Sequence, residues 1–402
     1  YGSWLGHSGS RLEVMGMSGL AECGEMTWSE AEVGFMRQAL KIAERGRGQV
    51  KPNPLVGCVL VKDGDVVAQG WHDHLGGLHA EQMAIADAEK GGISTNGTTA
   101  YVTLEPCNHH GRTPPCTEAL LWAGITSVVV AHTDPNPTVR GNGCEYLRRE
   151  GFAVKSGLLE DEAAVQMQSF LNWCEKRRPL VTLKIATDCN RAIDDLALDS
   201  HRFTSSDSLD AVHRLRRECD AIIIGVETVV RDNPSLTVRR IGLGDGKQPV
   251  RIILDRELRI PLDSTVLVDE HQTLILHTEG KAENAAALSS RKNVEVVCLK
   301  SADSHDGVDL NRVLTLLGDR EFHEIMVEGG AETARRFLAA GLIDRAIIIQ
   351  TENEFSNPLF LGIESKHLIE KGLAISTEVE WGGDQVELWS RRELPWPSNN
   401  WP

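Results

Sequence analysis

Two stretches decide the fold, HAE at 79–81 and TLEPCNHHGRTPPC at 103–116. Together they offer one imidazole, two thiolates and one carboxylate, from His79, Cys107, Cys116 and Glu81. One His and two Cys can hold zinc and leave its fourth tetrahedral position open, which is typical of catalytic zinc. A Glu two residues beyond the His can move protons without binding the metal, as in zinc deaminases of nucleobases. We therefore predict that His79, Cys107 and Cys116 bind catalytic zinc and that Glu81 transfers protons.

The predicted helices explain this spacing. His79 opens a helix that runs to about Glu89, and Cys116 opens another, whereas Cys107 lies in the loop after a strand at 98–104. The positive ends of two helix dipoles favour thiolate over thiol. In the middle of a helix, residues two apart do not share a face, so His79 and Glu81 can act together only at a helix start. The alternative is a structural zinc with His109 or His110 as fourth ligand.

Composition narrows the class of protein. The chain has 402 residues, 41% hydrophobic and 25% charged, which predicts a globular protein of two domains. Its net charge of −16 argues against nucleic acid as a partner. No apolar run is long enough to span a bilayer and no secretory segment is seen, so we expect no membrane partner and a cytoplasmic location. Nine cysteines without regular spacing make a disulfide framework improbable.

We divide the chain into a tag-like or disordered tail at 1–26, with Met15 or Met17 as native start, a zinc-dependent domain at 27–176 and a second domain at 177–396. In the first domain, alternating strands and helices predict a mostly parallel sheet, followed by one amphipathic helix at 160–175. For the second domain we predict strands at 180–186, 221–225, 250–254, 273–277, 294–298, 324–327 and 345–350, with helices at 206–218, 281–289, 310–320 and 331–340. Gly242, Gly244 and Gly246 open no helix, so we interpret them as an exposed loop rather than a dinucleotide fingerprint.

The chain resembles the bifunctional deaminase/reductase family of riboflavin biosynthesis. The matching stretches are 52–57 (PNPLVG), 79–81, 103–116, 134–137 (DPNP), 213–216, 225–230, 232–239 (DNPSLTVR), 249–255 and 327–331 (VEGGA). The resemblance implies an α/β protein with an N-terminal cytidine-deaminase-like three-layer domain and a C-terminal dihydrofolate-reductase-like α/β domain. It also implies zinc and NADPH as cofactors, a small phosphorylated pyrimidine as substrate and assembly into a homo-oligomer.

The resemblance also implies binding residues. On the deaminase side they are Asn53, His109, His110 and Arg112. On the substrate side of the reductase they are Ser200, Arg216, Leu236, Arg239 and Glu328, where Arg216 and Arg239 could hold a phosphate. On its nucleotide side they are Ala186, Thr228, Asp232, Gly329 and Gly330. Glycines that open a helix let a phosphate approach its N–H groups.

Two loops depart from the family pattern. The stretch 187–191 (TDCNR) replaces Ser-Leu-Asp-Gly, and 203–206 (FTSS) replaces an Ile-Thr-Gly-like turn. Loss of a Gly from a turn that needs positive φ is expected to change the loop, because other residues resist that conformation. Three alternatives therefore stay open: a deaminase with a degenerate second domain used for assembly, a deaminase of cytidine or nucleic acid, and a zinc-stabilised binding protein.

Overall fold

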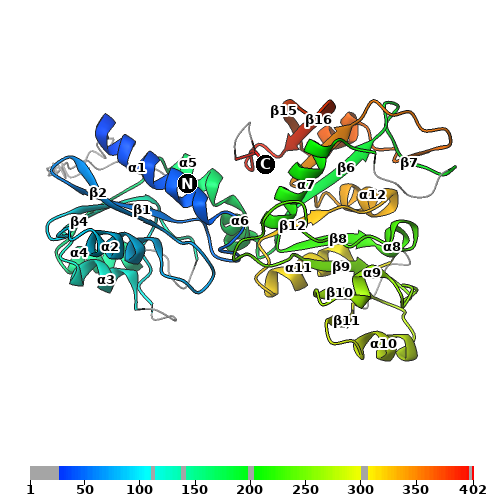
Figure 1. Cartoon of the computed structure of the whole chain (residues 1–402), viewed down its shortest axis with the longest axis horizontal. Coiled ribbons are helices and arrows are strands. Elements are labelled where there is room, and N and C mark those ends of the chain that lie inside the picture. Colours follow the sequence, from blue (N-terminus) through cyan, green and yellow to red (C-terminus); the bar gives the residue numbers. More distant parts are fainter. Residues whose placement is uncertain (1–26, 110–113, 137–141, 198–202, 300–306, 398–400) are drawn as a thin grey trace, which may run out of the picture.

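The computed structural model describes residues 27–109, 114–136, 142–197, 203–299, 307–397 and 401–402. The prediction of a tail at 1–26 lies outside these residues. Two separate sheets form two halves that lie side by side (Figure 1), with the first half built from residues up to about 176. Among the described residues, no helix has the length and apolarity needed to cross a membrane.

The first half contains a five-stranded sheet of order β2-β1-β3-β4-β5. Its strands are β1 (Gly57–Lys62), β2 (Asp65–Trp71), β3 (Thr99–Leu104), β4 (Ser127–His132) and β5 (Ala153–Ser156). The prediction of a mostly parallel sheet is wrong for β1, which is antiparallel to both β2 and β3. The reason is local, because Asp63 and Gly64 have φ of 53° and 89° and form the tight turn that reverses β1 into β2. Only the β3-β4 and β4-β5 pairs are parallel.

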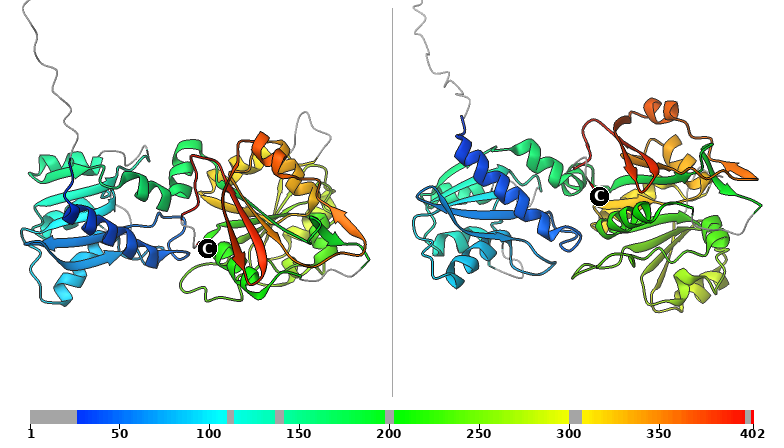
Figure 2. Two further views of the ribbon diagram at one scale, coloured as in Figure 1. Left: turned by 90° about the horizontal axis from the view of Figure 1, so that it is seen from above. Right: turned by 45° about the horizontal axis from the view of Figure 1, so that its top comes forward.

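Helices cover both faces of this sheet and make three layers (Figure 2). Alternate residues of β1 point to opposite faces, so Val59 packs with α1 (Glu30–Ala43) and Leu60 with α2 (Ala80–Lys90). α3 (Cys116–Trp122) and α4 (Asn142–Arg149) lie on the α2 side. Ser29 and Glu32 form a capping box at the start of α1, an arrangement whose cap is typically worth ~1 kcal/mol. A short 3₁₀ turn, η1 (Glu44–Gly46), follows α1.

The helix predicted at 160–175 is wrong as a single element. The chain forms α5 (Glu160–Gln166) and α6 (Gln168–Lys176), with Met167 at φ −107° and ψ 14° between them. The apolar period continues across the break, so the sequence pattern did not reveal it. The break directs α6 to the second half, where the Trp173 indole N–H donates to the Gly318 carbonyl at 2.8 Å. The Trp173 ring also lies 4.5 Å from the ring of His323.

The second half contains a nine-stranded sheet of order β11-β10-β9-β8-β12-β6-β13-β16-β15. The seven predicted strands are present as β6 (Leu180–Thr187), β8 (Ala221–Gly225), β9 (Val250–Leu254), β10 (Thr273–His277), β11 (Val294–Cys298), β12 (Glu324–Val327) and β13 (Arg345–Gln350). All seven run parallel, as their buried apolar runs favour. An antiparallel hairpin of β15 (Ala374–Trp381) and β16 (Asp384–Ser390), not predicted, completes the β13 edge.

Helices cover both faces of this sheet as well. α11 (Leu310–Asp319), α12 (Ala331–Ala339) and α13 (Ser365–Glu370) pack on one face. The other face carries α7 (Ser206–Glu218), α8 (Val226–Asp232), α9 (Thr265–Val268) and α10 (Ala282–Ser289). A small sheet of β7 (Ala192–Asp195) and β14 (Pro358–Phe360) stands apart from the large one. The two-domain α/β fold class predicted from the sequence is confirmed.

Candidate active sites

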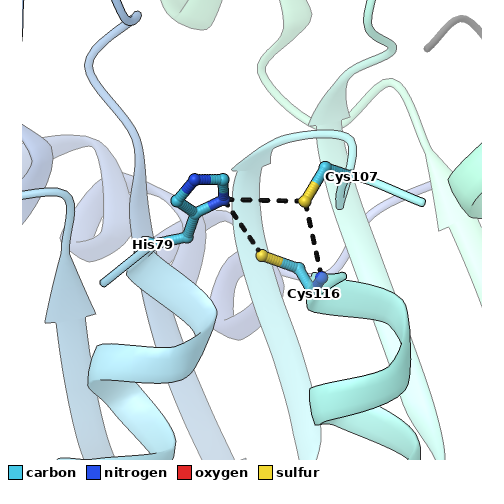
Figure 3. A group of neighbouring side chains, drawn as sticks. All are labelled: His79, Cys107 and Cys116. Carbon is cyan, nitrogen blue, oxygen red and sulfur yellow. Dashed lines mark hydrogen bonds between the residues drawn. The ribbon is translucent and has the colours of Figure 1, made fainter. Parts of the chain in front are cut away.

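The structure brings the predicted zinc ligands together (Figure 3). His79 Nδ1 lies 3.6 Å from Cys107 Sγ and 3.2 Å from Cys116 Sγ, and the three ligand atoms all lie within 4.8 Å of one another. Tetrahedral zinc with ordinary Zn–N and Zn–S bonds separates such atoms by about 3.6 Å. The donor set therefore fits zinc in chemistry and in spacing.

Local structure holds each of these side chains in place. His79 is the N-cap of α2, Cys116 is the first residue of α3, and Cys107 follows β3. Gln82 ties the two helix starts together, since its Oε1 accepts from the His79 N–H at 3.2 Å and its Nε2 donates to the Pro114 carbonyl at 2.9 Å. The sequence analysis did not select Gln82, because the partner on Pro114 is far away in the chain.

The ionisable groups of the cluster are strongly coupled. A hydrogen bond from Cys116 lowers the pKa of Cys107 to about 4, with further help from His79. The same bond, with burial, raises the pKa of Cys116. The Cys116 N–H also donates to Cys107 Sγ at 3.4 Å. The site thus favours a thiolate, the form that binds zinc.

Glu81 is only 3% exposed and lies on the first turn of α2, beside the cysteines. Burial, and then the negative charge of Cys107, raise the pKa of its carboxyl above the ordinary value. A carboxylate with a raised pKa is suited to accept and release protons near neutrality. This placement suits the role predicted for Glu81.

Asn53 lies near the cluster through His72, a buried residue that the sequence analysis did not select. His72 Nδ1 lies 3.0 Å from the Leu78 carbonyl and its Nε2 lies 3.0 Å from Asn53 Nδ2. A carbonyl can only accept, so Nδ1 carries the proton and Nε2 accepts from Asn53. The ring of His72 also lies edge-on to His79, with centroids 5.5 Å apart. The Asn53 amide is thereby oriented, and its Oδ1 is left to accept a further hydrogen bond.

Glu105 fixes the loop next to the cluster and was also not selected from the sequence. Its two carboxylate oxygens accept from the N–H groups of Asp134, at 3.1 Å, and Cys144, at 2.9 Å. Asn108 Oδ1 accepts from the Thr117 hydroxyl at 2.8 Å, which joins the loop of Cys107 to α3. His109 is exposed in this loop. The predicted residues His110, Arg112 and Ser200 lie outside the described residues.

A cavity of about 1250 Å³ opens in the second half. Six of the residues predicted for the reductase line it: Ala186, Thr228, Asp232, Glu328, Gly329 and Gly330. Gly330 caps α12, and its N–H donates to the Thr228 hydroxyl at 3.0 Å. A Cβ on Gly329 would lie 2.5 Å from Thr333 Cβ, so a glycine is required there. The glycines thus pack the strand end against the helix start and leave backbone open to a ligand.

Arg216, which was predicted to hold phosphate, is engaged within the protein. Its Nε and Nη2 donate to the two oxygens of Glu328 at 2.6 and 2.8 Å, and its Nη1 donates to the Thr237 carbonyl at 3.3 Å. Burial raises the pKa of Glu328, but the charge and hydrogen bonds of Arg216 outweigh it and lower that pKa to about 2. Arg216 therefore keeps Glu328 anionic at the edge of the cavity. Lys184 also lines the cavity, and burial lowers its pKa.

Leu236 and Arg239 are not among the described residues that line this cavity. Leu236 has φ 53° and a side chain that is 3% exposed in the core, so only its backbone could touch a ligand. Arg239 is exposed, and its Nη1 donates to Ser235 Oγ at 2.8 Å.

The altered loop at 187–191 keeps a left-handed residue. Arg191 has φ 68°, although it has a side chain, and its guanidinium pairs with Glu387 at 2.5 Å. The expectation that the loop avoids this conformation without Gly is wrong. Asp188 explains why, because its Oδ1 accepts from the N–H groups of Asn190 and Ala192, both at 2.8 Å, and holds the turn closed.

Comparison with known proteins decides the family. Residues 29–132 match the cytidine and deoxycytidylate deaminase zinc-binding region, and residues 181–384 match the RibD C-terminal domain. The riboflavin biosynthesis protein RibD of Aquifex aeolicus is 40% identical over 364 residues, which cover 90% of this chain and 99% of that protein. The chain belongs to the RibD family. The RibD of Escherichia coli K12 is 35% identical over 345 residues, covering 83% of this chain and 89% of that protein.

Two solved structures agree with the RibD assignment. A diaminohydroxyphosphoribosylaminopyrimidine deaminase/5-amino-6-(5-phosphoribosylamino)uracil reductase of Thermotoga maritima superposes with a TM-score of 0.76 at 33% identity. Acinetobacter baumannii RibD gives 0.79 at 32% identity, and both alignments cover 90% of this chain and 99% of the other. As a RibD protein, the chain is a bifunctional enzyme of riboflavin biosynthesis, with a deaminase in its first half and a reductase in its second.

Proposed function

We propose that the first half deaminates 2,5-diamino-6-(5-phosphoribosylamino)pyrimidin-4-one and that the second half reduces the ribosyl group of the product to ribityl with NADPH. The Thermotoga relative, whose name states both activities on such compounds, supports this substrate. The observation that carries the proposal is the cluster of His79, Cys107 and Cys116 with Glu81 beside it.

In the deaminase half, His79, Cys107 and Cys116 would hold zinc. Bound zinc supplies a water of lowered pKa at its open position. Glu81 takes a proton from the attacking water and delivers it to the ring nitrogen, then passes a second proton to the departing amine. Water and the amino compound thus give a carbonyl and ammonia. Asn53 Oδ1, oriented by His72, accepts a hydrogen bond from an N–H of the pyrimidine.

In the reductase half, the cavity would hold the nucleotide beside the sugar of the substrate. The nicotinamide supplies the hydride. Backbone N–H groups of Gly329 and Gly330, at the start of α12, suit a phosphate of the cofactor. Glu328, kept anionic by Arg216, accepts hydrogen bonds from sugar hydroxyls. Arg256 and Arg335 are among the arginines of the lining that favour the additional phosphate of NADPH over NADH.

A two-step assay tests this function. Purified enzyme with the diaminopyrimidinone is expected to release ammonia without a nucleotide, and to oxidise NADPH only after that. NADH at the same concentration is expected to support a slower second step. Deamination without NADPH oxidation would instead establish the alternative of a degenerate second half. Turnover of cytidine or tRNA, and not of the riboflavin precursor, would overturn the substrate assignment.

We also infer that the halves divide near residues 176–179 and that the enzyme assembles into a homo-oligomer. Leu196, Leu359 and Phe360, on or beside the small β7–β14 sheet, are 52%, 37% and 52% exposed. A second copy of the chain would cover these apolar side chains. Sedimentation velocity tests this expectation, and a monomer at assay concentration would contradict it.

A further inference from the structure

The loop at 47–53 belongs to the deaminase half but lies against the reductase half. It connects η1 to the segment before β1, it carries Asn53, and it reaches the second half beside α6 (Figure 1). Two parts of the reductase half meet it. One is the C-terminal end of α7, and the other is the turn at 242–246, which the sequence analysis interpreted as an exposed loop.

The end of α7 contacts the loop through polar groups. The Lys51 ammonium donates to the carbonyl of Cys219, the residue that follows α7. Arg47 Nη1 donates to the Glu218 carboxylate at 3.0 Å, with side chains that are 18% and 9% exposed. Glu218 is held from a second side, because the Trp401 indole N–H donates to the same carboxylate oxygen at 3.0 Å.

The glycine turn contacts the loop through its backbone. The Asp245 N–H donates to Gln49 Oε1 at 3.3 Å. A Cβ built on Gly246 would lie 2.4 Å from the Gly48 carbonyl oxygen, a distance that no side chain tolerates. Gly246 is thus required for the close approach of the two halves. By contrast, among the described atoms nothing lies within 4 Å of a Cβ built on Gly242 in the same turn.

We propose that the reductase half positions the substrate loop of the deaminase, and that Lys51 and Gly246 are positioning residues for deamination. Asn53 is two residues from Lys51, and its N–H donates to the Val50 carbonyl at 3.0 Å, so the loop moves as a unit. A shift at Lys51 or Gly48 moves the Asn53 amide relative to His72 and the zinc ligands. This inference rests on the proposed role of Asn53 in holding the pyrimidine.

The glycine turn offers a matched pair of full-length variants. Gly246→Ala forces the Gly48 carbonyl away and is expected to raise the KM of deamination roughly fivefold, the worth of one weakened hydrogen bond, with kcat nearly unchanged. Gly242→Ala, in the same turn with open space, is expected to match wild type. Reduction of added deaminated substrate is measured in both variants and is expected to stay at the wild-type rate, which shows an intact second half. Equal deamination kinetics in the two variants would overturn the proposal.

Lys51→Met gives an independent test, since it removes the donor and keeps most of the stem. A similar rise in KM is expected, and Lys51→Arg is expected to restore part of the affinity because it again donates to the Cys219 carbonyl. Lys62→Met is the control, because Lys62 donates to a backbone carbonyl, that of Asn96, within the deaminase half. Zinc content and Tm are expected to match wild type in all three. An unchanged KM in Lys51→Met defeats the positioning role, whereas absent deamination in wild type defeats the proposed function itself.

Discussion

The deaminase site and the reductase cavity are built in different ways. The reactive side chains of the deaminase come from two short stretches, each at the start of a helix. The reductase cavity is lined by residues from β6, α8, the loop after β9, α11 and α12, with many backbone atoms among them. A site of the first kind depends on a few side chains at fixed spacing. A site of the second kind depends on how strands and helices pack, so single substitutions should act through shape and stability.

Removal of zinc should give the largest effect and should separate the two halves. Dialysis against a chelator, or Cys116→Ser, is expected to abolish ammonia release because the ligand set fits zinc and Glu81 alone cannot activate water. Reduction of added deaminated substrate should continue. Cys298→Ser, at an exposed thiol, is the control. Loss of both activities on zinc removal would show that the halves are not independent in this way.

Glu81→Gln tests the side-chain chemistry of the deaminase without disturbing the metal. The amide keeps the shape but cannot carry the proton, so kcat is expected to fall about 10²–10⁴-fold, the usual worth of a general acid–base group. Metal analysis should find zinc at the wild-type level. Glu89→Gln, at the exposed end of the same helix, should behave like wild type. Deamination that survives in Glu81→Gln would remove the proposed mechanism.

The buried Arg216–Glu328 pair tests the cavity through its stability. The folded pKa of Glu328, about 2, lies below its ordinary value of 4.5, so its contribution is full above about pH 5 and is lost as pH falls toward 2. A depressed pKa of this size corresponds to an effect of order 1–3 kcal/mol. Denaturant unfolding from pH 6 to pH 3 should therefore show a shallower loss of unfolding free energy in Glu328→Gln than in wild type. Identical slopes would mean that the pair does not stabilise the fold.

Arg191 gives the smallest predicted effect and tests the altered loop. Arg191→Gly and Arg191→Ala both lose the ion pair with Glu387, so their difference isolates the backbone at φ 68°. Gly should be the more stable variant by about 1 kcal/mol, because a Cβ resists the left-handed conformation. The midpoint of urea unfolding measures this difference. If Ala equals Gly, the turn carries no such strain.

The same contrast explains what could be read from the sequence. The seven parallel strands were predicted well because their apolar runs are buried on both faces. The β15–β16 hairpin was missed because β15 is largely exposed and polar, with Glu378 and Glu380 at alternate positions. The break at Met167 was missed because an apolar period does not record a change in backbone angles.

The sequence by itself determined the metal chemistry and the family. The identities of His79, Cys107 and Cys116, and their positions at helix starts, specify a ligand set whatever the rest of the chain does. The tertiary structure alone decided that Arg216 pairs with Glu328, 112 residues away, and that Gly246 lies against Gly48. Such contacts follow from the order of strands in a sheet and from the approach of two halves. No local pattern of residue types contains that information.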